Sequence, residues 1–280
     1  MIRQSNLILT YVSGESLFDS HSFEVFVRSA KTVPDTDVVV LTDEISDAHA
    51  QWLEDLDVEI EDGHKAGYIF RDRHLAYWKY LNDHGYKYKM AMTTDGRDVV
   101  FQSSPFDWAA GWKTRFDSIR GDKKFLGCFV ILTAEGHKMS QSGFACIEEF
   151  EFQRDTHKEL HKSDHNRWIV NGGVALGTPR ALQDYHMTVW AMMTKTAGRC
   201  TDQAAINWLF HYLEDDDMYS VSFPQHDNLC LTGEGVKEGA VTPTIKEGKV
   251  FNPKGIPYCL IHQWDRVEYL KETVLAQYPS

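Results

Sequence analysis

One stretch decides the fold of this chain: Lys89-Met90-Ala91-Met92-Thr93-Thr94-Asp95-Gly96-Arg97-Asp98-Val99-Val100-Phe101-Gln102-Ser103-Ser104-Pro105-Phe106. It begins as an apolar, strand-like segment, stops at an acidic turn that holds Asp95 and Asp98, and resumes as a second apolar run that Pro105 ends. In an open α/β sheet, ligands bind where loops leave the carboxyl ends of the strands. Two carboxylates on such an exposed loop can both point at one ligand. The alternative is an ordinary surface turn in which Arg97 pairs with Asp98.

The residues before this stretch alternate between strands and helices. Apolar, β-rich runs predict buried strands at 6–12, 37–42 and, more weakly, 58–60. Helical spacing of apolar residues predicts helices over 17–30, 46–53 and 71–82, the last of which leads into the central strand at 88–94. This order predicts an α/β fold: a Rossmann-like, open twisted sheet, doubly wound and mostly parallel, with helices on both faces.

Composition narrows the function classes. The 280 residues carry a formal charge of −12, which argues against nonspecific nucleic-acid binding because that needs a basic face. Five cysteines, widely spaced and odd in number, indicate reduced thiols rather than a disulfide or zinc framework. No apolar run approaches the roughly 20 residues of a membrane span, and no signal peptide precedes the first strand. We therefore expect a protein of the cytoplasm.

Further polar motifs follow along the chain. Arg73 lies near the start of the helix over 71–82, where the positive end of the helix dipole favours anions. Paired glycines in Asn171-Gly172-Gly173, expected just before a strand, allow a close backbone approach. Asp202 and Gln203 open a helix that Thr201 can cap, and His262 ends a short strand. Each has a plainer interpretation: a solvated arginine, a turn, a helix-start carboxylate and a structural histidine.

Two regions give weaker signals. His157, His161 and His165 have a spacing that would align them on a helix face, as a zinc site requires, but their Lys, Asp and Asn neighbours favour a solvated polar segment. The second is a loop-rich region with an Asp triplet at 215–217, after which a hairpin is expected near 241–251.

An apolar run before these two regions predicts another strand, over 125–133.

The pattern Asp-x-Arg-Asp-Val-Val-Phe-Gln-x-x-Pro-Phe, residues 95–106, resembles the aspartate-rich metal and nucleotide loop of GT-A glycosyltransferases. That loop usually has Asp at the position of Arg97. The candidate residues along the chain occur in the order of the same family: Asp43, Arg73, Asp95 and Asp98, 171–173, Asp202-Gln203, His262. Within it, the chain is similar to the small glycosyltransferases that large algal viruses encode to decorate capsid glycans, and most similar to a xylosyltransferase.

The resemblance implies one GT-A domain over 1–280, with a nucleotide-binding half at 1–106 and a half for donor sugar and acceptor at 107–280. It implies transfer of a sugar, xylose, from a UDP-sugar donor to a hydroxyl of a glycan on a glycoprotein. The residues that it implies for contacts with the nucleotide or donor are Thr10, Tyr11, Val12, Asp43, Arg73, Asp95, Gly96, Arg97, Asn171, Gly172, Gly173 and Gln203.

The resemblance also implies a metal ion, Mn²⁺ or Mg²⁺, held by Asp95, Asp98 and His262. Because a guanidinium cannot ligate a cation, Arg97 departs from the family pattern. Either Asp98 supplies the missing oxygen, or Arg97 itself neutralises phosphate. For an inverting displacement a carboxylate must take the proton of the acceptor hydroxyl. We assign that role to Asp202, with Glu149 and Glu151 as reserve candidates.

Two other classes of protein remain as alternatives. A nucleotidyltransferase that makes a nucleotide sugar would share the first elements, but it would usually carry a glycine-rich phosphate loop where this chain has Ser13-Gly14-Glu15-Ser16. A glycan-binding module without activity would stack sugars on tryptophans, here Trp108, Trp112, Trp168 and Trp264.

Overall fold

The computed structural model describes residues 4–64, 67–120, 128–156, 167–196, 200–212 and 219–279. Its strands are β1 Ser5–Val12, β2 Thr36–Thr42, β3 Glu59–Asp62, β4 Tyr88–Asp95, β5 Val99–Phe101, β6 Val130–Lys138, β7 Trp168–Gly177, β8 Tyr219–Ser222, β9 Cys230–Thr232, β10 Thr244–Lys246, β11 Lys249–Phe251 and β12 Leu260–His262. Its α-helices are α1 His21–Ala30, α2 Asp47–Asp55, α3 Ile69–His84, α4 Pro105–Arg120, α5 Gly143–Thr156, α6 Pro179–Met193, α7 Asp202–Tyr212, α8 Gly233–Lys237 and α9 Glu268–Gln277.

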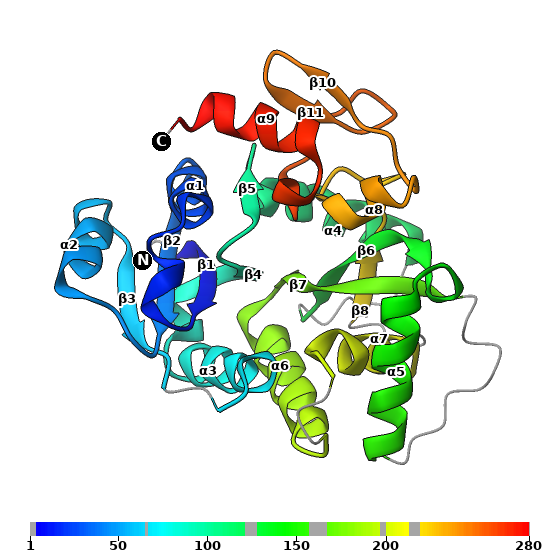
Figure 1. The fold of residues 1–280 in the computed structure, drawn as a ribbon, viewed down its shortest axis with the longest axis horizontal. Coiled ribbons are helices and arrows are strands. Elements are labelled where there is room, and N and C mark those ends of the chain that lie inside the picture. Colours follow the sequence, from blue (N-terminus) through cyan, green and yellow to red (C-terminus); the bar gives the residue numbers. More distant parts are fainter. Residues whose placement is uncertain are drawn as a thin grey trace.

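A seven-stranded sheet forms the centre of the molecule, in the order β3-β2-β1-β4-β7-β6-β8 (Figure 1). Strands β1, β2, β3 and β4 are parallel neighbours, and β6 is parallel to β8. Among the described strands of this sheet, only β7 runs against its neighbours, pairing antiparallel with both β4 and β6. The fold class predicted from the alternation of strands and helices, a mostly parallel α/β sheet, is confirmed.

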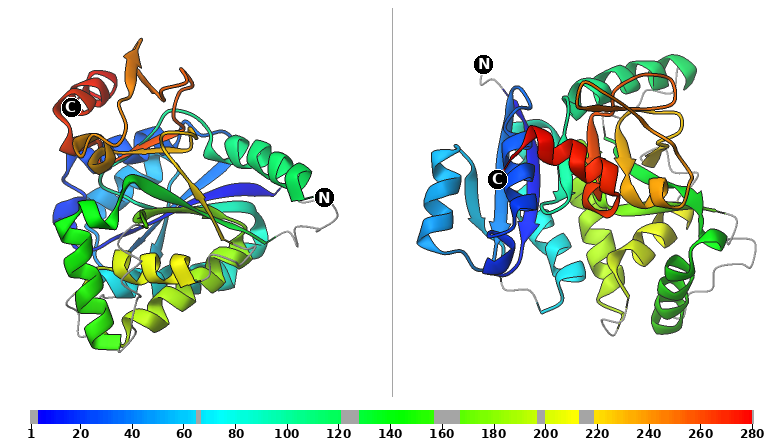
Figure 2. Two further views of the ribbon diagram at one scale, coloured as in Figure 1. Left: turned by 90° about the vertical axis from the view of Figure 1, so that its right-hand side faces the viewer. Right: turned by 45° about the horizontal axis from the view of Figure 1, so that its top comes forward.

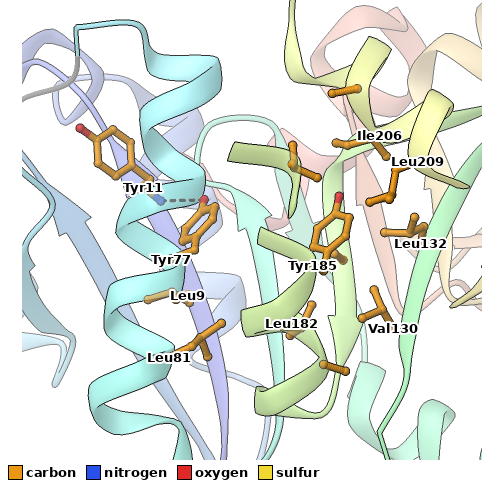
Figure 3. Close-up of a cluster of buried hydrophobic side chains, with 14 of the residues drawn as sticks. Leu9, Tyr11, Tyr77, Leu81, Val130, Leu132, Leu182, Tyr185, Ile206 and Leu209 are labelled. Atoms are coloured by element: carbon orange, nitrogen blue, oxygen red, sulfur yellow. Dashed lines mark hydrogen bonds between the residues drawn. The ribbon is translucent and has the colours of Figure 1, made fainter. Parts of the chain in front are cut away.

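Side chains of the sheet supply two hydrophobic clusters, one on each face. Because successive strand residues point to opposite faces, Leu7 and Leu9 of β1 join one cluster while Ile8 and Val12 join the other. The first cluster includes residues of α3, α6 and α7, which lie together on one side of the strands in Figure 2. In Figure 3 the side chains of α3 and α6 lie near those of β1 and β6, and the hydroxyl of Tyr77 accepts a hydrogen bond from the backbone N–H of Tyr11. Helices α1, α2 and α4 contribute to the second cluster.

A second, three-stranded sheet has the order β5-β12-β9. Strand β5 directly follows the acidic turn after β4, and β12 pairs with it antiparallel so that His262 lies opposite Val99. Residues 260–262 therefore pair with the strand that directly follows the acidic turn at 95–98.

Element bounds differ from the sequence predictions at several places. Strand β6 begins at Val130 and continues to Lys138, beyond the predicted end at 133. Gly172 and Gly173 lie inside β7 rather than before a strand, because β7 already begins at Trp168. The predicted hairpin is confirmed by the antiparallel pair β10 and β11. The histidine row at 157, 161 and 165 and the Asp triplet at 215–217 lie outside the described residues.

Across the described ranges, every helix is too short or too polar to cross a bilayer.

Candidate active site

Three side chains converge at the carboxyl end of β4. Asp95 is the last residue of β4, Asp98 immediately precedes β5, and His262 ends β12. The pairing of β12 with β5 brings the imidazole Nε2 of His262 to 3.3 Å from Asp95 Oδ2 and 3.3 Å from Asp98 Oδ1. The backbone reinforces this contact, since the N–H of Gln263 donates to the carbonyl of Asp98 at 2.7 Å. Asp98 is only 3% exposed, so the expectation that both carboxylates lie on an exposed loop is wrong for it: β12 covers that side of the turn.

The donor atoms of this group suit a divalent cation. One ligand atom from each of Asp95, Asp98 and His262 lies within 4.8 Å of the others. In an octahedral shell with bonds of about 2.1 Å, neighbouring ligand atoms are about 3 Å apart, close to the 3.3 Å observed. Both ring nitrogens of His262 are buried without a hydrogen-bond partner among the described residues, which is costly unless something else occupies them. The three residues therefore fit the predicted Mn²⁺ or Mg²⁺.

The charges of this group are strongly coupled. Burial would raise the pKa of Asp95, but the nearby Arg73 and then His262 lower it below its ordinary value. Burial would likewise lower the pKa of His262, but Asp98, together with Asp95, raises it to about 9. Two anionic carboxylates thus stabilise a positive charge at the place where a cation would sit.

Arg73 links this group to the residues of helix α7. Its Nη1 donates to Asp95 Oδ1, and its Nε donates to Asp202 Oδ2 at 2.8 Å, with Nη2 contacting the same oxygen. The Arg73 side chain is 12% exposed. It is therefore an ion-paired bridge between two carboxylates, and the plainer interpretation as a solvated arginine is wrong.

Asp202 is the first residue of α7, and it is 2% exposed. Its Oδ2 accepts from Arg73 and lies 2.8 Å from His74 Nε2. Its Oδ1 faces the backbone of Gly172, where a Cβ would lie only 3.3 Å away. The two carboxylate oxygens therefore have different neighbours: Oδ2 contacts α3, and Oδ1 faces β7.

A buried carboxylate that the sequence analysis missed orients the two predicted amide side chains. Glu135 Oε1 accepts from Asn171 Nδ2 at 3.1 Å and from Gln203 Nε2 at 2.9 Å. The Oδ1 of Asn171 in turn accepts from the N–H of Gly173 at 2.7 Å. Because an ionised carboxylate only accepts hydrogen bonds, Glu135 fixes the amide nitrogen of Gln203 toward itself and leaves the amide oxygen for another donor. The alternation Thr133, Glu135, His137 was the available signal, and ending the predicted strand at 133 concealed it.

These groups surround one cavity of about 390 Å³. Its lining contains eight of the predicted site residues, from both halves of the chain: Arg73, Asp95, Asn171, Gly172, Gly173, Asp202, Gln203 and His262. Residues that were not predicted complete the wall, namely Phe70, Glu135, Ser142, Ala145, Thr201, Glu234, Gln263 and Arg266. The cavity therefore joins the candidate metal group to the carboxylate of Asp202 within one space.

Five other predicted donor contacts, Thr10, Tyr11, Val12, Asp43 and Gly96, are not part of the lining of this cavity. Gly96 packs on Thr10, whose Oγ1 would be 2.7 Å from a Cβ at that glycine. Val12 belongs to the hydrophobic core, and the hydroxyl of Tyr11 donates to the carbonyl of His64 at 2.9 Å. Asp43 accepts from Ser13 Oγ at 2.9 Å and from the N–H of Gly14 at 3.1 Å. Their role in binding a nucleotide remains a prediction.

Neither Arg97 nor the reserve carboxylate Glu151 lines the cavity. The Arg97 side chain is 57% exposed, and its Nη2 is 3.9 Å from Asp98 Oδ2. Glu151, on α5, pairs with Arg154 at 3.1 Å. The side chain of Glu149 lies outside the described part of the structure.

The four tryptophans of the glycan-binding alternative do not form one exposed platform. Trp264 is 1% exposed, while Trp108 and Trp112 pack against the core cluster that contains α1 and α4. Trp168 is 38% exposed, on β7, where it packs edge-on against Phe223. The four tryptophans therefore do not share one surface on which sugars could stack.

No protein-family model matches the chain, and no curated protein matches it in sequence. Solved structures match its fold over most of its length. The apo structure of WbbM, a bifunctional glycosyltransferase, matches at a TM-score of 0.53 and 12% identity, over 97% of this chain and 50% of WbbM. An active-site mutant of LgtC matches at a TM-score of 0.53 and 13% identity, over 96% of this chain and 95% of LgtC. Mouse xyloside xylosyltransferase 1, also in its apo form, matches at 0.50 and 10%, over 92% and 97% of the two chains.

These likenesses establish the fold. The chain has the mixed α/β fold of GT-A glycosyltransferases, with the central sheet and flanking helices described above. It spans half the length of WbbM and nearly all of LgtC. The carboxylate–imidazole group at the carboxyl end of β4 and the adjoining cavity lie where a sheet of this kind binds its ligands.

Proposed function

We propose that this protein is a glycosyltransferase that moves a sugar from a nucleoside diphosphate donor, UDP, to a hydroxyl of a glycan. One observation carries the proposal: a group that fits a divalent cation opens into a cavity lined by a buried arginine, a carboxylate and an oriented amide, in a fold that known glycosyltransferases share. When bound, the cation would neutralise the charge that develops on the departing diphosphate.

The residues around the cavity have separate roles in this proposal. Asp95, Asp98 and His262 would hold the cation. Arg73 keeps the carboxylates of Asp95 and Asp202 at a fixed separation by donating to both. Gln203, whose amide nitrogen is held by Glu135, accepts a hydrogen bond from a sugar hydroxyl through its amide oxygen.

Asp202 is the proposed base. Its Oδ1 is the oxygen that does not contact Arg73 or His74, and it faces the glycine backbone at the cavity wall. An acceptor hydroxyl within hydrogen-bond reach of Oδ1 could pass its proton to it as the glycosidic bond forms. This role belongs to an inverting displacement, in which the acceptor oxygen attacks the anomeric carbon and the diphosphate leaves with the bonding electrons.

The finer identity of the reaction follows from the sequence resemblance. We propose xylose as the sugar, a glycoprotein glycan as the acceptor and the cytoplasm as the location, as in the algal-virus enzymes that decorate capsid glycans. One matching structure is a xyloside xylosyltransferase, which is consistent with that choice of sugar and says no more of this chain than its fold.

A panel of nucleotide sugars tests the proposal. We expect UDP with Mn²⁺ to raise the melting temperature more than UDP alone, because the carboxylates need phosphate oxygens to complete the shell of the cation. UDP-xylose should give the largest shift and should be consumed when a glycan acceptor is present. An equal UDP shift in EDTA would contradict the metal assignment. An intact donor after hours with varied acceptors would favour the non-catalytic alternative, and turnover of a sugar phosphate with UTP would favour a nucleotidyltransferase.

A further inference from the structure

A chain of buried polar side chains extends behind Asp202, on the side away from the cavity. His74 Nε2 lies 2.8 Å from Asp202 Oδ2, and the other nitrogen of the same ring, Nδ1, lies 2.8 Å from Nδ1 of His186. The Nε2 of His186 lies 3.0 Å from the hydroxyl of Thr93. Asp202, His74, His186 and Thr93 are each at most 3% exposed. The chain joins four residues from α7, α3, α6 and β4.

The direction of each hydrogen bond in the chain follows from the donors that surround Asp202. Arg73 can only donate, so Asp202 Oδ2, which it contacts, is an acceptor and His74 Nε2 must carry the hydrogen. Burial lowers the pKa of His74, and burial together with the neighbouring His74 and Arg73 lowers the pKa of His186 well below its ordinary value. We therefore expect both rings to be neutral at pH 7, each with one N–H.

If both rings are neutral, the hydrogen atoms on the ring nitrogens can be placed in only one way. With its hydrogen on Nε2, His74 accepts at Nδ1, so His186 must carry its own hydrogen on Nδ1. His186 then accepts at Nε2 from the hydroxyl of Thr93. All three hydrogen bonds donate toward Asp202, and each ring nitrogen of His74 and His186 has a partner.

We propose that His74 and His186 are positioning residues that hold the carboxylate of Asp202 with Oδ2 turned away from the cavity and Oδ1 turned into it. The part that concerns catalysis rests on the proposed function of Asp202. Arg73 binds the same oxygen but also binds Asp95, so it responds to whatever occupies the metal group. The histidine chain supplies a second anchor for Asp202, one that makes no hydrogen bond to the metal group and is contributed by α3 and α6.

Nuclear magnetic resonance of the wild-type protein, with ¹⁵N-labelled histidine, tests the chain without any assay of activity. We expect His74 as the neutral Nε2–H tautomer and His186 as the neutral Nδ1–H tautomer, which is the less common form in water. The signals are assigned by their loss in His74→Gln and His186→Gln. An imidazolium at His74, or a hydrogen on Nε2 of His186, would overturn the proposal even if the protein proves to be a glycosyltransferase. The predicted tautomers would support the chain even if the donor is not a UDP-sugar.

Two substitutions at one position then test what the chain does. The amide N–H of His74→Gln can still donate to Asp202, whereas His74→Leu fills a similar volume without a donor. We expect His74→Leu to lower kcat roughly 10- to 100-fold, the usual effect of losing one hydrogen bond to a charged group, and His74→Gln to restore most of it. The KM for UDP-sugar should change less than kcat. His84→Gln, near the end of the same helix, is the control that leaves the rate unchanged. Equal losses in His74→Gln and His74→Leu, with both folded by circular dichroism, would mean that the ring only fills space.

Discussion

The two oxygens of the Asp202 carboxylate have different tasks. Oδ2 accepts from Arg73 and His74, and Oδ1 faces the cavity wall at Gly172. This division makes one residue suitable either as a base or as a contact for the donor sugar, and a single substitution separates the two.

We expect Asp202→Asn to keep near-normal affinity for UDP-sugar and to lose roughly 10²–10⁴-fold in transfer rate, the usual contribution of general-base catalysis. Titration of UDP and of UDP-sugar against this variant is the measurement. A loss of affinity for UDP-sugar alone would make Asp202 a donor-sugar contact. Unchanged turnover would leave it as a helix-start carboxylate, and attention would move to Glu149 and Glu151.

Gly173 is packed tightly against the metal group. A Cβ there would lie 2.6 Å from Asp95 Oδ2 and would also overlap the ring of His262. We expect Gly173→Ala to fold with a loss of about 1–3 kcal/mol from overpacking and to lose the Mn²⁺-dependent part of the UDP thermal shift. Gly111→Ala, in α4, is the matched control, because nothing lies within 4 Å of its Cβ position. An undiminished Mn²⁺ effect in Gly173→Ala would exclude the His262 position as part of the metal group.

The raised pKa of His262 predicts a pH dependence of stability without metal. Its pKa is about 9 in the folded protein, above the 6.5 of an ordinary histidine. The protonated ring therefore stabilises the fold fully below pH about 6.5, and this stabilisation is lost as the pH rises through about 9. In EDTA we expect a loss of up to about 3 kcal/mol over that interval, measured by urea unfolding.

His262→Asn should remove this pH dependence, and His84→Gln should retain it. Because a cation competes with the ring proton, the thermal shift with Mn²⁺ and UDP should be larger at pH 9 than at pH 6.5. A metal effect that decreases over that interval would contradict ligation by the imidazole.

At the scale of elements, the short strand β12 positions one residue of the metal group. It is the central strand of its sheet, pairing with β5 on one side and β9 on the other. Its three residues place His262 opposite Val99, one residue after Asp98. The metal group thus depends on a pairing between segments about 160 residues apart in the sequence.

We expect Ile261→Pro to abolish the Mn²⁺-dependent shift, because proline removes a backbone donor from a central strand. Ile245→Pro is the control, since β10 belongs to a separate two-stranded sheet and Ile245 is 37% exposed. Circular dichroism and the shift are measured for both variants. A folded Ile261→Pro protein with a normal Mn²⁺ effect would show that His262 reaches its position without β12.

At the scale of the whole molecule, the charge of −12 opposes the binding of an anionic donor. Groups near the site must overcome this repulsion. Because the charge of Arg73 is neutralised by Asp95 and Asp202, most of the attraction for the diphosphate has to come from the cation. Without metal we therefore expect the affinity for UDP to rise as NaCl is raised from about 20 to 200 mM, because salt screens the net repulsion.

With saturating Mn²⁺ the same titration, followed by calorimetry, should show a weaker or opposite salt dependence. If affinity without metal falls with added salt, the exposed Arg97 and the cavity residue Arg266 are attracting the phosphates directly, and Arg97 takes the role that the sequence analysis left open for it.

The sequence by itself determined the fold class and the residues on either side of the central acidic turn. The alternation of apolar runs and helical spacing up to residue 101 is a local pattern, and strand and helix periods report local patterns directly. It also placed Asp95, Asp202 and His262 at the ends of elements, where ligand groups of an α/β sheet occur.

Only the tertiary structure decided which of these residues meet. The contact of His262 with Asp98, the bridge from Arg73 to Asp202 and the burial of Asp98 all depend on pairing and packing between distant segments, for which neither hydrophobic period carries information. Glu135 and the histidine chain were missed for the same reason. A buried polar side chain has meaning only through its partners, and those partners come from α3, α6, α7 and β7, far away in the sequence.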